Sequence, residues 1–261
     1  MTDAFYQHLG GGRFASSPFV VGPWDAHLSH GSPPAALMVH ELERTFPRPD
    51  TRVGRVAFDF FGPVPVTELG VTCEIVRPGS RIELSRARLS AQGRTAMEAT
   101  AWRVAVGAGR VQEVADSREV PKLPGPQAQR LFVDVPSFGY GEALEWRFAE
   151  GSFDTMGPAT VYSRPRMPLL AGTGEPMSPL GRLLVMVDSA NGISAELPPS
   201  RFTFVPVELT VGIRRYPRTE WVGMRAKTTI DADGIGQTQA ELFDEAGYLG
   251  TALQTLFVSP R

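Results

Sequence analysis

The feature that most constrains the fold of this chain is an order of predicted elements that occurs twice. Each half begins with two short strand-like runs, continues with an amphipathic helix and ends with four longer strand-like runs separated by turn residues. Aligning the Ser-Pro pairs that open the two helices relates Ser32 to Ser178, an offset of 146 residues. Aligning Pro63 with Pro217 gives an offset of 154 residues along the longer strands. Few aligned residues are identical between the two halves. The evidence for a duplication is therefore the shared order and length of the predicted elements.

The 261 residues are sufficient for two domains of ordinary size. We expect an N-terminal domain over residues 1–110 and a C-terminal domain over residues 141–261. The segment 111–140 is rich in proline, glycine and charge and has no sustained period, which is typical of a linker. Both domains are predicted to be α+β, with an antiparallel meander after the helix. Two unrelated α+β domains of similar size are the alternative to a duplication.

The second helix is predicted over residues 178–192. Ser178 is a suitable N-cap and Pro179 suits the first helical position, while Asn191-Gly192 is a plausible end. Asp188 does not fit this helix, because it lies beside the apolar stripe and near the C-terminus, where the helix dipole disfavours a negative charge. Asp188 is therefore a candidate functional group, and a solvated or locally hydrogen-bonded side chain is the alternative.

The first helix is predicted to begin at Ser32 and to run for about four turns. Its apolar side contains Leu37, Met38 and Leu42, and its charged residues are expected on the opposite side. These charged residues are Glu41, Glu43 and Arg44.

Composition excludes several functions. With 26 Lys and Arg against 28 Asp and Glu, the chain has no basic surplus for nucleic acid. It has no apolar run long enough to span a membrane and no recognisable signal peptide, and its single cysteine, Cys73, cannot form an internal disulfide. We therefore expect a cytoplasmic protein. The four histidines lack metal-ligand spacing, and neither a phosphate loop nor a G-x-S-x-G elbow occurs, so we expect no metal or cofactor.

Four stretches, taken in order, resemble the type II acyl-CoA thioesterases and their relatives. They are HGSPPAAL in the first helix, RPGSRIELSRARLSAQGR in the first set of strands, VDSANG in the second helix and EAGYLGTALQ in the last strands. The resemblance implies a double hotdog fold, in which a curved antiparallel sheet wraps a long helix in each of two repeats. It also implies hydrolysis of an acyl-CoA thioester by an activated water, without a covalent intermediate.

In that family an aspartate, a threonine or serine and a glutamine hold the water. The resemblance assigns the aspartate to Asp188 and the glutamine to Gln254, but it places Pro206 at the position of the hydroxyl. Strand alternation predicts that Thr210 lies on the same face as Pro206, about 13 Å further along, so Thr210 is the candidate substitute. Glu208 lies between them and is predicted either as a base or orienter or as an exposed carboxylate, for instance one paired with Arg214.

The duplication adds an argument from the residues themselves. At the two offsets the counterparts of Asp188, Thr210 and Gln254 are Leu42, Val56 and Thr100, which are apolar or smaller. We therefore predict that the three polar side chains converge into one catalytic site per chain, carried by the second half.

Two alternatives stay open: an acyl-CoA or lipid-like ligand that is bound without cleavage, and a hydratase, which would need an Asp/His pair. His30, at the start of the first helix, is predicted to have a capping or structural role, with substrate contact as the alternative. Because sheet edges tend to pair with further copies, we also predict a homo-oligomer.

Overall fold

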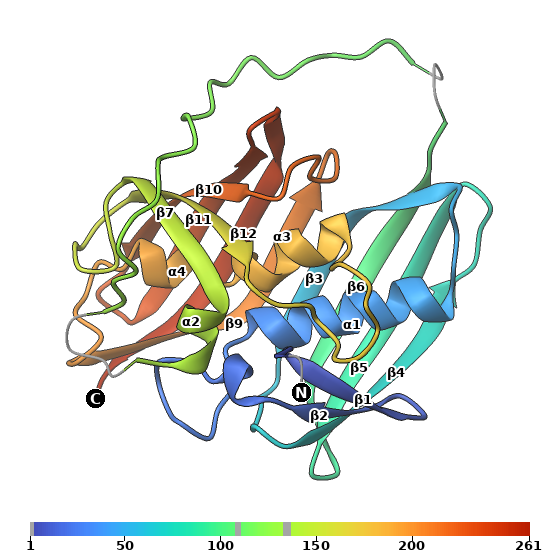
Figure 1. The fold of residues 1–261 in the computed structure, drawn as a ribbon, viewed down its shortest axis with the longest axis horizontal. Helices are drawn as coiled ribbons and strands as arrows, with labels where there is room; N and C mark the ends of the chain where they lie inside the picture. The colour runs from blue at the N-terminus through green and yellow to red at the C-terminus, as the bar shows by residue number, and fades with distance from the viewer. Residues whose placement is uncertain (1–2, 108–110, 133–136) are drawn as a thin grey trace.

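The computed structural model describes residues 3–107, 111–132 and 137–261, and its strands form a single twelve-stranded antiparallel sheet (Figure 1). The strands of the first half are β1 (Tyr6–Gly10), β2 (Arg13–Ser16), β3 (Thr51–Phe60), β4 (Glu68–Arg77), β5 (Ile82–Ala91) and β6 (Arg94–Ala105). Those of the second half are β7 (Leu144–Glu150), β8 (Ala159–Pro165), β9 (Phe202–Ile213), β10 (Val222–Ile230), β11 (Ile235–Asp244) and β12 (Gly247–Pro260).

The two halves have the same topology. From its outer edge inward, the first half runs β1-β2-β4-β5-β6-β3 and the second runs β7-β8-β10-β11-β12-β9. The halves join where β3 pairs with β9, between residues 55–59 and 208–212. The predicted order of strand, strand, helix and four strands is therefore present twice. The turn between β1 and β2 contains Gly10, Gly11 and Gly12, whose positive φ angles favour glycine.

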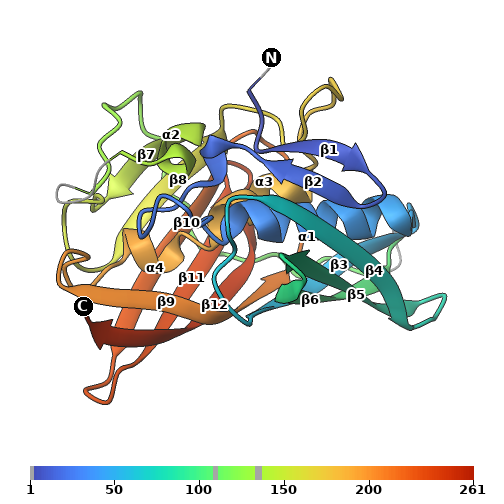
Figure 2. The same cartoon turned by 90° about the horizontal axis from the view of Figure 1, so that it is seen from below.

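Two helices, α1 (Ser32–Thr45) and α3 (Pro179–Val187), lie next to each other inside the curve of the sheet (Figures 1 and 2). The predicted apolar side of α1 is confirmed, because Leu37, Met38 and Leu42 are fully buried. The predicted position of Glu41 on the exposed side is wrong. Glu41 is buried, and Arg44 binds both of its carboxylate oxygens, which compensates the charge.

The second predicted helix is interrupted at the residue that the sequence had singled out. Ser178 caps α3 as predicted, its hydroxyl accepting the Gly181 N–H, but the helix ends at Val187. Asp188 is the C-cap, and a short helix, α4 (Ala190–Ile193), follows it. A continuous helix over 178–192 was therefore wrong, and the break turns Asp188 away from a regular helical position. The first helix begins at Ser32 as predicted, and Gly31 is its N-cap.

The segment between the halves is bound to the second half rather than free. Val120 and Leu123 pack against a small aromatic cluster of that half, and the Tyr162 hydroxyl donates to the Pro121 carbonyl. Gln127 and Gln129 extend along the edge strand β7, where each side-chain amide pairs with one backbone N–H and one carbonyl, at Phe148 and at Trp146 respectively.

These contacts occupy backbone groups of β7 that a further copy would need for edge pairing. The predicted homo-oligomer therefore stays a prediction, and this edge does not favour it. Two shorter elements, η1 (Pro18–Val20) and α2 (Gly139–Ala143), were not predicted. They lie beside each other, since the Gly139 Cα approaches the Pro18 carbonyl so closely that a Cβ there would overlap it.

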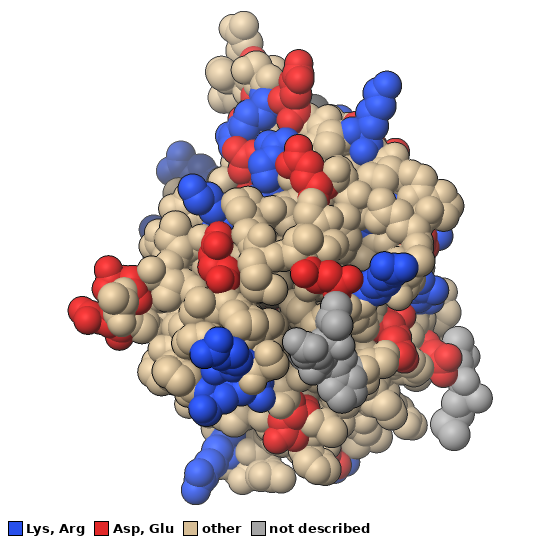
Figure 3. Space-filling model, turned by 90° about the vertical axis from the view of Figure 1, so that its left-hand side faces the viewer, with Lys and Arg blue, Asp and Glu red and all other residues tan. Residues whose placement is uncertain are grey.

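On the face shown in Figure 3, basic and acidic residues are interspersed, so that face carries no continuous basic field of the kind that binds a phosphate backbone. None of the helices in the described ranges is long and apolar enough to cross a membrane.

Candidate active site

Asp188 lies where α3 ends, between the two helices. Its side chain is only 4% exposed, and its backbone N–H donates to the Ser32 hydroxyl at 3.1 Å. Ser32 belongs to the first turn of α1, so the start of one repeat's helix holds the end of the other's. A carboxylate is thereby fixed deep in the core, where its charge is poorly solvated.

Gln254 meets Asp188 from β12. Its Nε2 donates to Asp188 Oδ1 at 2.9 Å and to the Asp188 carbonyl at 3.3 Å, and its Oε1 accepts the Asn191 N–H at 3.1 Å. The predicted convergence of Asp188 and Gln254 is therefore confirmed as geometry. Because both ends of the amide are occupied, Gln254 fixes the orientation of the carboxylate and the start of α4 together.

Thr210 does not join them, and the reason is a β-bulge. Along the β9–β12 ladder Thr255 pairs with Glu208 but Leu256 pairs with Pro206, so Val207 is an extra residue. An extra residue reverses the alternation, and the predicted placement of Thr210 on the face of Pro206 is wrong. Thr210 pairs with Leu253, whereas Gln254 pairs with Leu209, so Thr210 and Gln254 point to opposite faces of the sheet.

Glu208 secures this bulge. Its Oε1 accepts the Thr255 N–H at 2.9 Å and the Thr255 hydroxyl at 3.0 Å, and its Oε2 accepts the Thr210 hydroxyl at 3.1 Å. Arg214, which we considered as its partner, binds Glu113 instead. Glu208 thus satisfies a ladder N–H next to the bulge, and it is not placed to act as a base beside Asp188.

A cavity of about 360 Å³ reaches Asp188 beside the bulge, where β9 no longer pairs with β3. Its walls are mostly apolar, and its polar residues are Ser29, His30, Asp188 and Asn191. The apolar wall consists of Trp24, Leu28, Phe60, Pro63, Val64, Val205, Pro206, Val207 and Phe257. An apolar cavity with a few convergent polar groups is the usual form of a small-molecule site. Pro206 lines it, and Thr210 and Gln254 do not.

His30 stands beside the carboxylate. Its Nδ1 accepts the Ser32 N–H at 3.1 Å and lies 3.5 Å from Asp188 Oδ2, and its ring stacks on Tyr140 with centroids 3.8 Å apart. The Tyr140 hydroxyl is held in turn by the Val185 carbonyl and the Ser189 hydroxyl. Burial lowers the pKa of His30 from 6.5 to about 3, so the imidazole is neutral and its contact with Asp188 is not an ion pair.

Burial raises the pKa of Asp188 from 3.8 to about 7, although hydrogen bonds from Gln254 and from the Gly31 backbone oppose the rise. The neighbouring lone pair of His30 Nδ1 acts in the same direction as burial, because two acceptors 3.5 Å apart favour a proton on the carboxyl group. Gly31 is required here for space, since a Cβ on it would lie 2.5 Å from Asp188 Oδ2. A carboxylate whose pKa lies near neutrality is suited to accept and return a proton.

Sequence reasoning missed Asn191 as a cavity residue and gave His30 a mainly structural role. Asn191 lies one helical turn after Asp188, and its Nδ2 donates to the Phe204 carbonyl at 3.3 Å. Its Oδ1 accepts no hydrogen bond from the residues that the structure describes. The VDSANG stretch contained this signal, because the asparagine follows the aspartate at helical spacing.

The position that corresponds to this cavity at the end of α1 is occupied by a side chain. At the offset of 154 residues Gly62, on the cavity wall, is the counterpart of Tyr216. The Tyr216 hydroxyl accepts the Val53 N–H at 2.8 Å, and the ring packs against the core. Nearby, Arg103 is buried and donates to the carbonyls of Leu42, at 2.7 Å, and of Phe46, which ties the end of α1 to the sheet.

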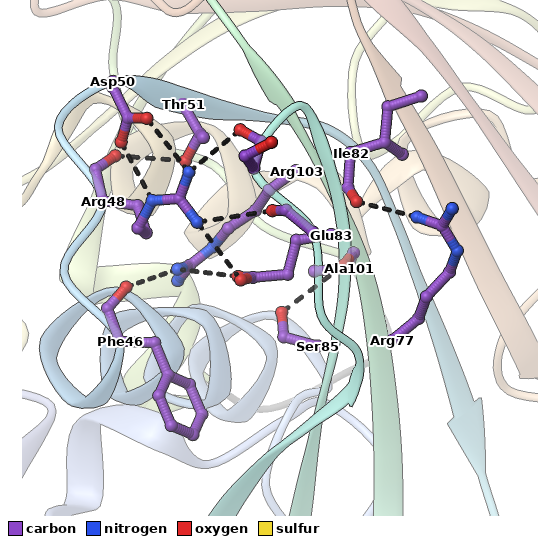
Figure 4. A network of polar contacts seen from close by, with 12 residues as sticks. Phe46, Arg48, Asp50, Thr51, Arg77, Ile82, Glu83, Ser85, Ala101 and Arg103 are labelled. Atoms are coloured by element: carbon purple, nitrogen blue, oxygen red, sulfur yellow. Dashed lines mark hydrogen bonds and ion pairs between the residues drawn. The ribbon is translucent and has the colours of Figure 1, made fainter.

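Figure 4 shows that this arginine belongs to a wider network of polar contacts, in which Glu83 lies between Arg103 and Arg48 and Arg48 also binds Asp50. At the end of α1 there is thus a closed set of ion pairs, whereas at the end of α3 there is an open cavity. Among the described residues, no group of three or more His, Cys, Asp or Glu side chains is arranged to hold a metal ion.

Comparison with known proteins identifies the family. A model of the acyl-CoA thioesterase C-terminal domain matches residues 114–258, and a model of the N-terminal domain of the same proteins matches residues 20–104. The chain belongs to the acyl-CoA thioesterase family. A search of curated protein sequences found no match. The predicted resemblance to acyl-CoA thioesterases is thereby confirmed.

Solved structures of similar fold cover nearly the whole chain. A TesB protein of Mycobacterium avium subspecies paratuberculosis is 15% identical with a TM-score of 0.69, over 98% of this chain and 96% of its own. The acyl-CoA thioesterase II TesB2 of Mycobacterium marinum is 16% identical with a TM-score of 0.68, over 98% and 95%. A hot dog protein of unknown function from Alicyclobacillus acidocaldarius is 17% identical with a TM-score of 0.73, over 98% and 97%. The fold of this acyl-CoA thioesterase family member is the predicted double hotdog.

Proposed function

We propose that this protein hydrolyses acyl-CoA thioesters, with Asp188 as the general base that activates a water. The observation that carries the proposal is the buried Asp188–Gln254 pair, in which the aspartate lines an apolar cavity. Burial raises the pKa of Asp188 to about 7, so a substantial fraction of the carboxylate is ionised at neutral pH and can accept a proton.

In the proposed reaction a water molecule donates one hydrogen to Asp188 and attacks the thioester carbonyl carbon. As the new C–O bond forms, the carbonyl electron pair moves to oxygen and the proton passes to the carboxylate. When the tetrahedral intermediate collapses, the C–S bond breaks, and Asp188 returns the proton to the departing CoA sulfur. Gln254 does not line the cavity, so its part is to keep Asp188 in one orientation.

Asn191 supplies the second contact for the water. Its Oδ1 is free to accept the water's other hydrogen, and its Nδ2 is held by Phe204, so the acceptor is fixed in the cavity wall. This asparagine would take the part that the family resemblance gives to a hydroxyl, which Pro206 cannot supply. Thr210 has no part in the proposal, because it lies on the other face of the sheet.

The test is release of free thiol from short-chain, long-chain and aryl acyl-CoAs by the wild type and by Asp188→Asn. We expect turnover of at least one substrate class and a loss of about 10²- to 10⁴-fold in kcat in the variant, as is typical when a general base is removed. Equal turnover by both proteins would exclude Asp188 as the base.

A second candidate is binding without cleavage, which the proline in place of a hydroxyl favours. Thermal stabilisation by acyl-CoAs without any release of thiol would support that candidate. The contact between His30 and Asp188 supplies the Asp/His pair that a hydratase would need. However, His30 Nδ1 already accepts the Ser32 N–H, and Nε2 carries the hydrogen of the neutral ring. The ring therefore cannot act as a base. Loss of enoyl absorbance on an enoyl-CoA substrate would detect that activity. The cytoplasmic location stays a prediction.

A further inference from the structure

Hydrolysis of a thioester needs a hydrogen-bond donor for the carbonyl oxygen as well as a base for the water. The backbone N–H groups where the chain enters α1 are the first candidates, and they are already used. Gly31 donates to the Asp188 carboxylate and Ser32 donates to His30 Nδ1. The N–H groups of Ser29 and His30 donate to the carbonyls of Val64 and Val20.

Next to Asp188, the imidazole of His30 is a further candidate, because it lines the cavity and contacts the carboxylate. Because Nδ1 accepts a backbone hydrogen bond, a neutral ring must carry its own hydrogen on Nε2. Burial lowers the pKa of His30 to about 3, which keeps the ring in this neutral form throughout the neutral pH range. Stacking on Tyr140 and the bond from Ser32 together fix the plane and the rotation of the ring.

The Nε2–H itself has no partner among the residues that the structure describes, and it is not among their fully buried unpaired atoms. His30 lines the same cavity as Asp188, and the other ring nitrogen, Nδ1, lies 3.5 Å from Asp188 Oδ2. A fixed donor that lines the same cavity as the proposed base is suited to stabilise charge as it develops on a carbonyl oxygen.

We infer that His30 is a catalytic residue whose Nε2–H donates to the thioester carbonyl oxygen. In the attack of water, the electron pair of the carbonyl moves to this oxygen, where Nε2–H stabilises it, and His30 gains and loses no proton. When the C–S bond breaks, the carbonyl forms again and the hydrogen bond weakens. This inference rests on the proposed thioesterase function, and it gives one side chain from each half of the chain a part in the reaction.

Two substitutions separate the nitrogens of the ring. In His30→Asn the amide oxygen takes the place of Nδ1 and still accepts from Ser32, but the donor at Nε2 is gone. In His30→Gln the amide nitrogen takes the place of Nε2, so the donor is kept and the acceptor for Ser32 is lost. The measurements are kcat and KM on the acyl-CoA that the wild type hydrolyses fastest, together with the melting temperature of each protein.

If His30 is the carbonyl donor, His30→Asn loses about 10²- to 10³-fold in kcat, as when one oxyanion donor is removed, with KM changed less. His30→Gln then keeps more activity than His30→Asn, although it has lost the contact with Ser32. If the role is only structural, the order reverses, because His30→Asn keeps the structural contact. Activity of His30→Asn at least equal to that of His30→Gln overturns the inference.

A spectroscopic measurement keeps the inference testable if either variant is unstable. A thioester labelled with ¹³C at the carbonyl is bound to Asp188→Asn, in which turnover is slow, and its carbonyl stretch is recorded. We expect a shift to lower frequency than in solution, and loss of this shift in the double variant with His30→Asn. An unshifted carbonyl overturns the inference. Failure of the wild type to hydrolyse any acyl-CoA would instead refute the proposed function.

Discussion

The buried carboxyl group of Asp188 should make the stability of the protein depend on pH in a way that one substitution removes. Its pKa is raised from 3.8 to about 7, which is about three pKa units and corresponds to about 4 kcal/mol between its protonated and ionised forms. For a group whose pKa is raised on folding, the stabilisation is complete below the unfolded value of 3.8. It is lost as the pH rises through 7.

His30 acts in the opposite direction. Burial lowers its pKa from 6.5 to about 3, so the folded protein loses stability as the pH falls below 6.5, where the unfolded chain takes up a proton. The two slopes partly cancel in the wild type. The quantity to measure is therefore the difference in the free energy of unfolding between the wild type and Asp188→Asn, because His30 contributes to both proteins.

Urea unfolding of both proteins at pH 5 and pH 8 measures this difference. Relative to Asp188→Asn, the free energy of unfolding of the wild type should fall by on the order of 2 to 3 kcal/mol between pH 5 and pH 8. Most of the pH range in which the folded protein holds a proton on Asp188 that the unfolded chain has lost lies between these values. The control is the variant Asp154→Asn, which makes the same substitution at an exposed position. A difference for Asp188→Asn that is the same at both pH values would refute the argument that burial raises the pKa of this carboxyl group.

Three further predictions follow from the site. The value of kcat/KM should rise with pH and level off above an apparent pKa near 7, because Asp188 must be ionised to accept a proton; a profile that is flat from pH 5 to 9 contradicts this. Gly62→Tyr should fill the cavity, as Tyr216 fills the equivalent position in the other repeat, and should raise KM by at least about tenfold. The control Gly62→Ala should bind substrate normally. Both variants should fold, since no atom lies within 4 Å of a Cβ at Gly62. Thr210→Val should keep wild-type kcat and lose at most about 1 kcal/mol of stability with its bond to Glu208, as unfolding in urea would show.

The long strands and the two helix starts could be predicted from the sequence because local signals fix them. β-branched and aromatic runs bounded by proline and glycine turns gave all eight long strands, and the Ser-Pro pairs marked where α1 and α3 begin. The break at Asp188 could not be predicted in this way. It depends on Ser32 and Gln254, which bind the backbone there and lie more than 60 residues away in either direction.

The error at Thr210 has a physical cause that the sequence contained. Alternation along a strand holds only while the ladder is regular, and a proline, which has no N–H, is found in strands mainly at edges and bulges. Pro206 therefore signalled that the face of Thr210 could not be counted from it. The same bulge separates β9 from β3, and it is beside this separation that the cavity reaches Asp188.

The structure also explains why a cavity is open at only one of two equivalent positions in the described repeats. Each repeat has a bulge in its central strand, with Gly54 as the extra residue in β3 and Val207 in β9, so both copies have the irregularity beside which a cavity can form. In one copy Tyr216 occupies that place and binds the N–H of Val53, and in the other the corresponding residue is Gly62. Whether the cavity is open or filled therefore depends on the side chain at one position of the repeat.

The open cavity nevertheless belongs to neither half alone. His30 and Phe60 come from the first repeat, Asp188 and Asn191 from the second, and the Ser32 hydroxyl that binds the Asp188 backbone crosses between them. We predicted that the second half alone carries the site. The candidate site instead lies at the interface of the helices α1 and α3, with residues from both halves. Because the proposed base and the proposed carbonyl donor lie on different repeats, their distance depends on the packing of α1 against α3, next to the pairing of β3 with β9. Tandem fusion keeps the two repeats in this arrangement at any protein concentration, whereas separate copies would have to associate first.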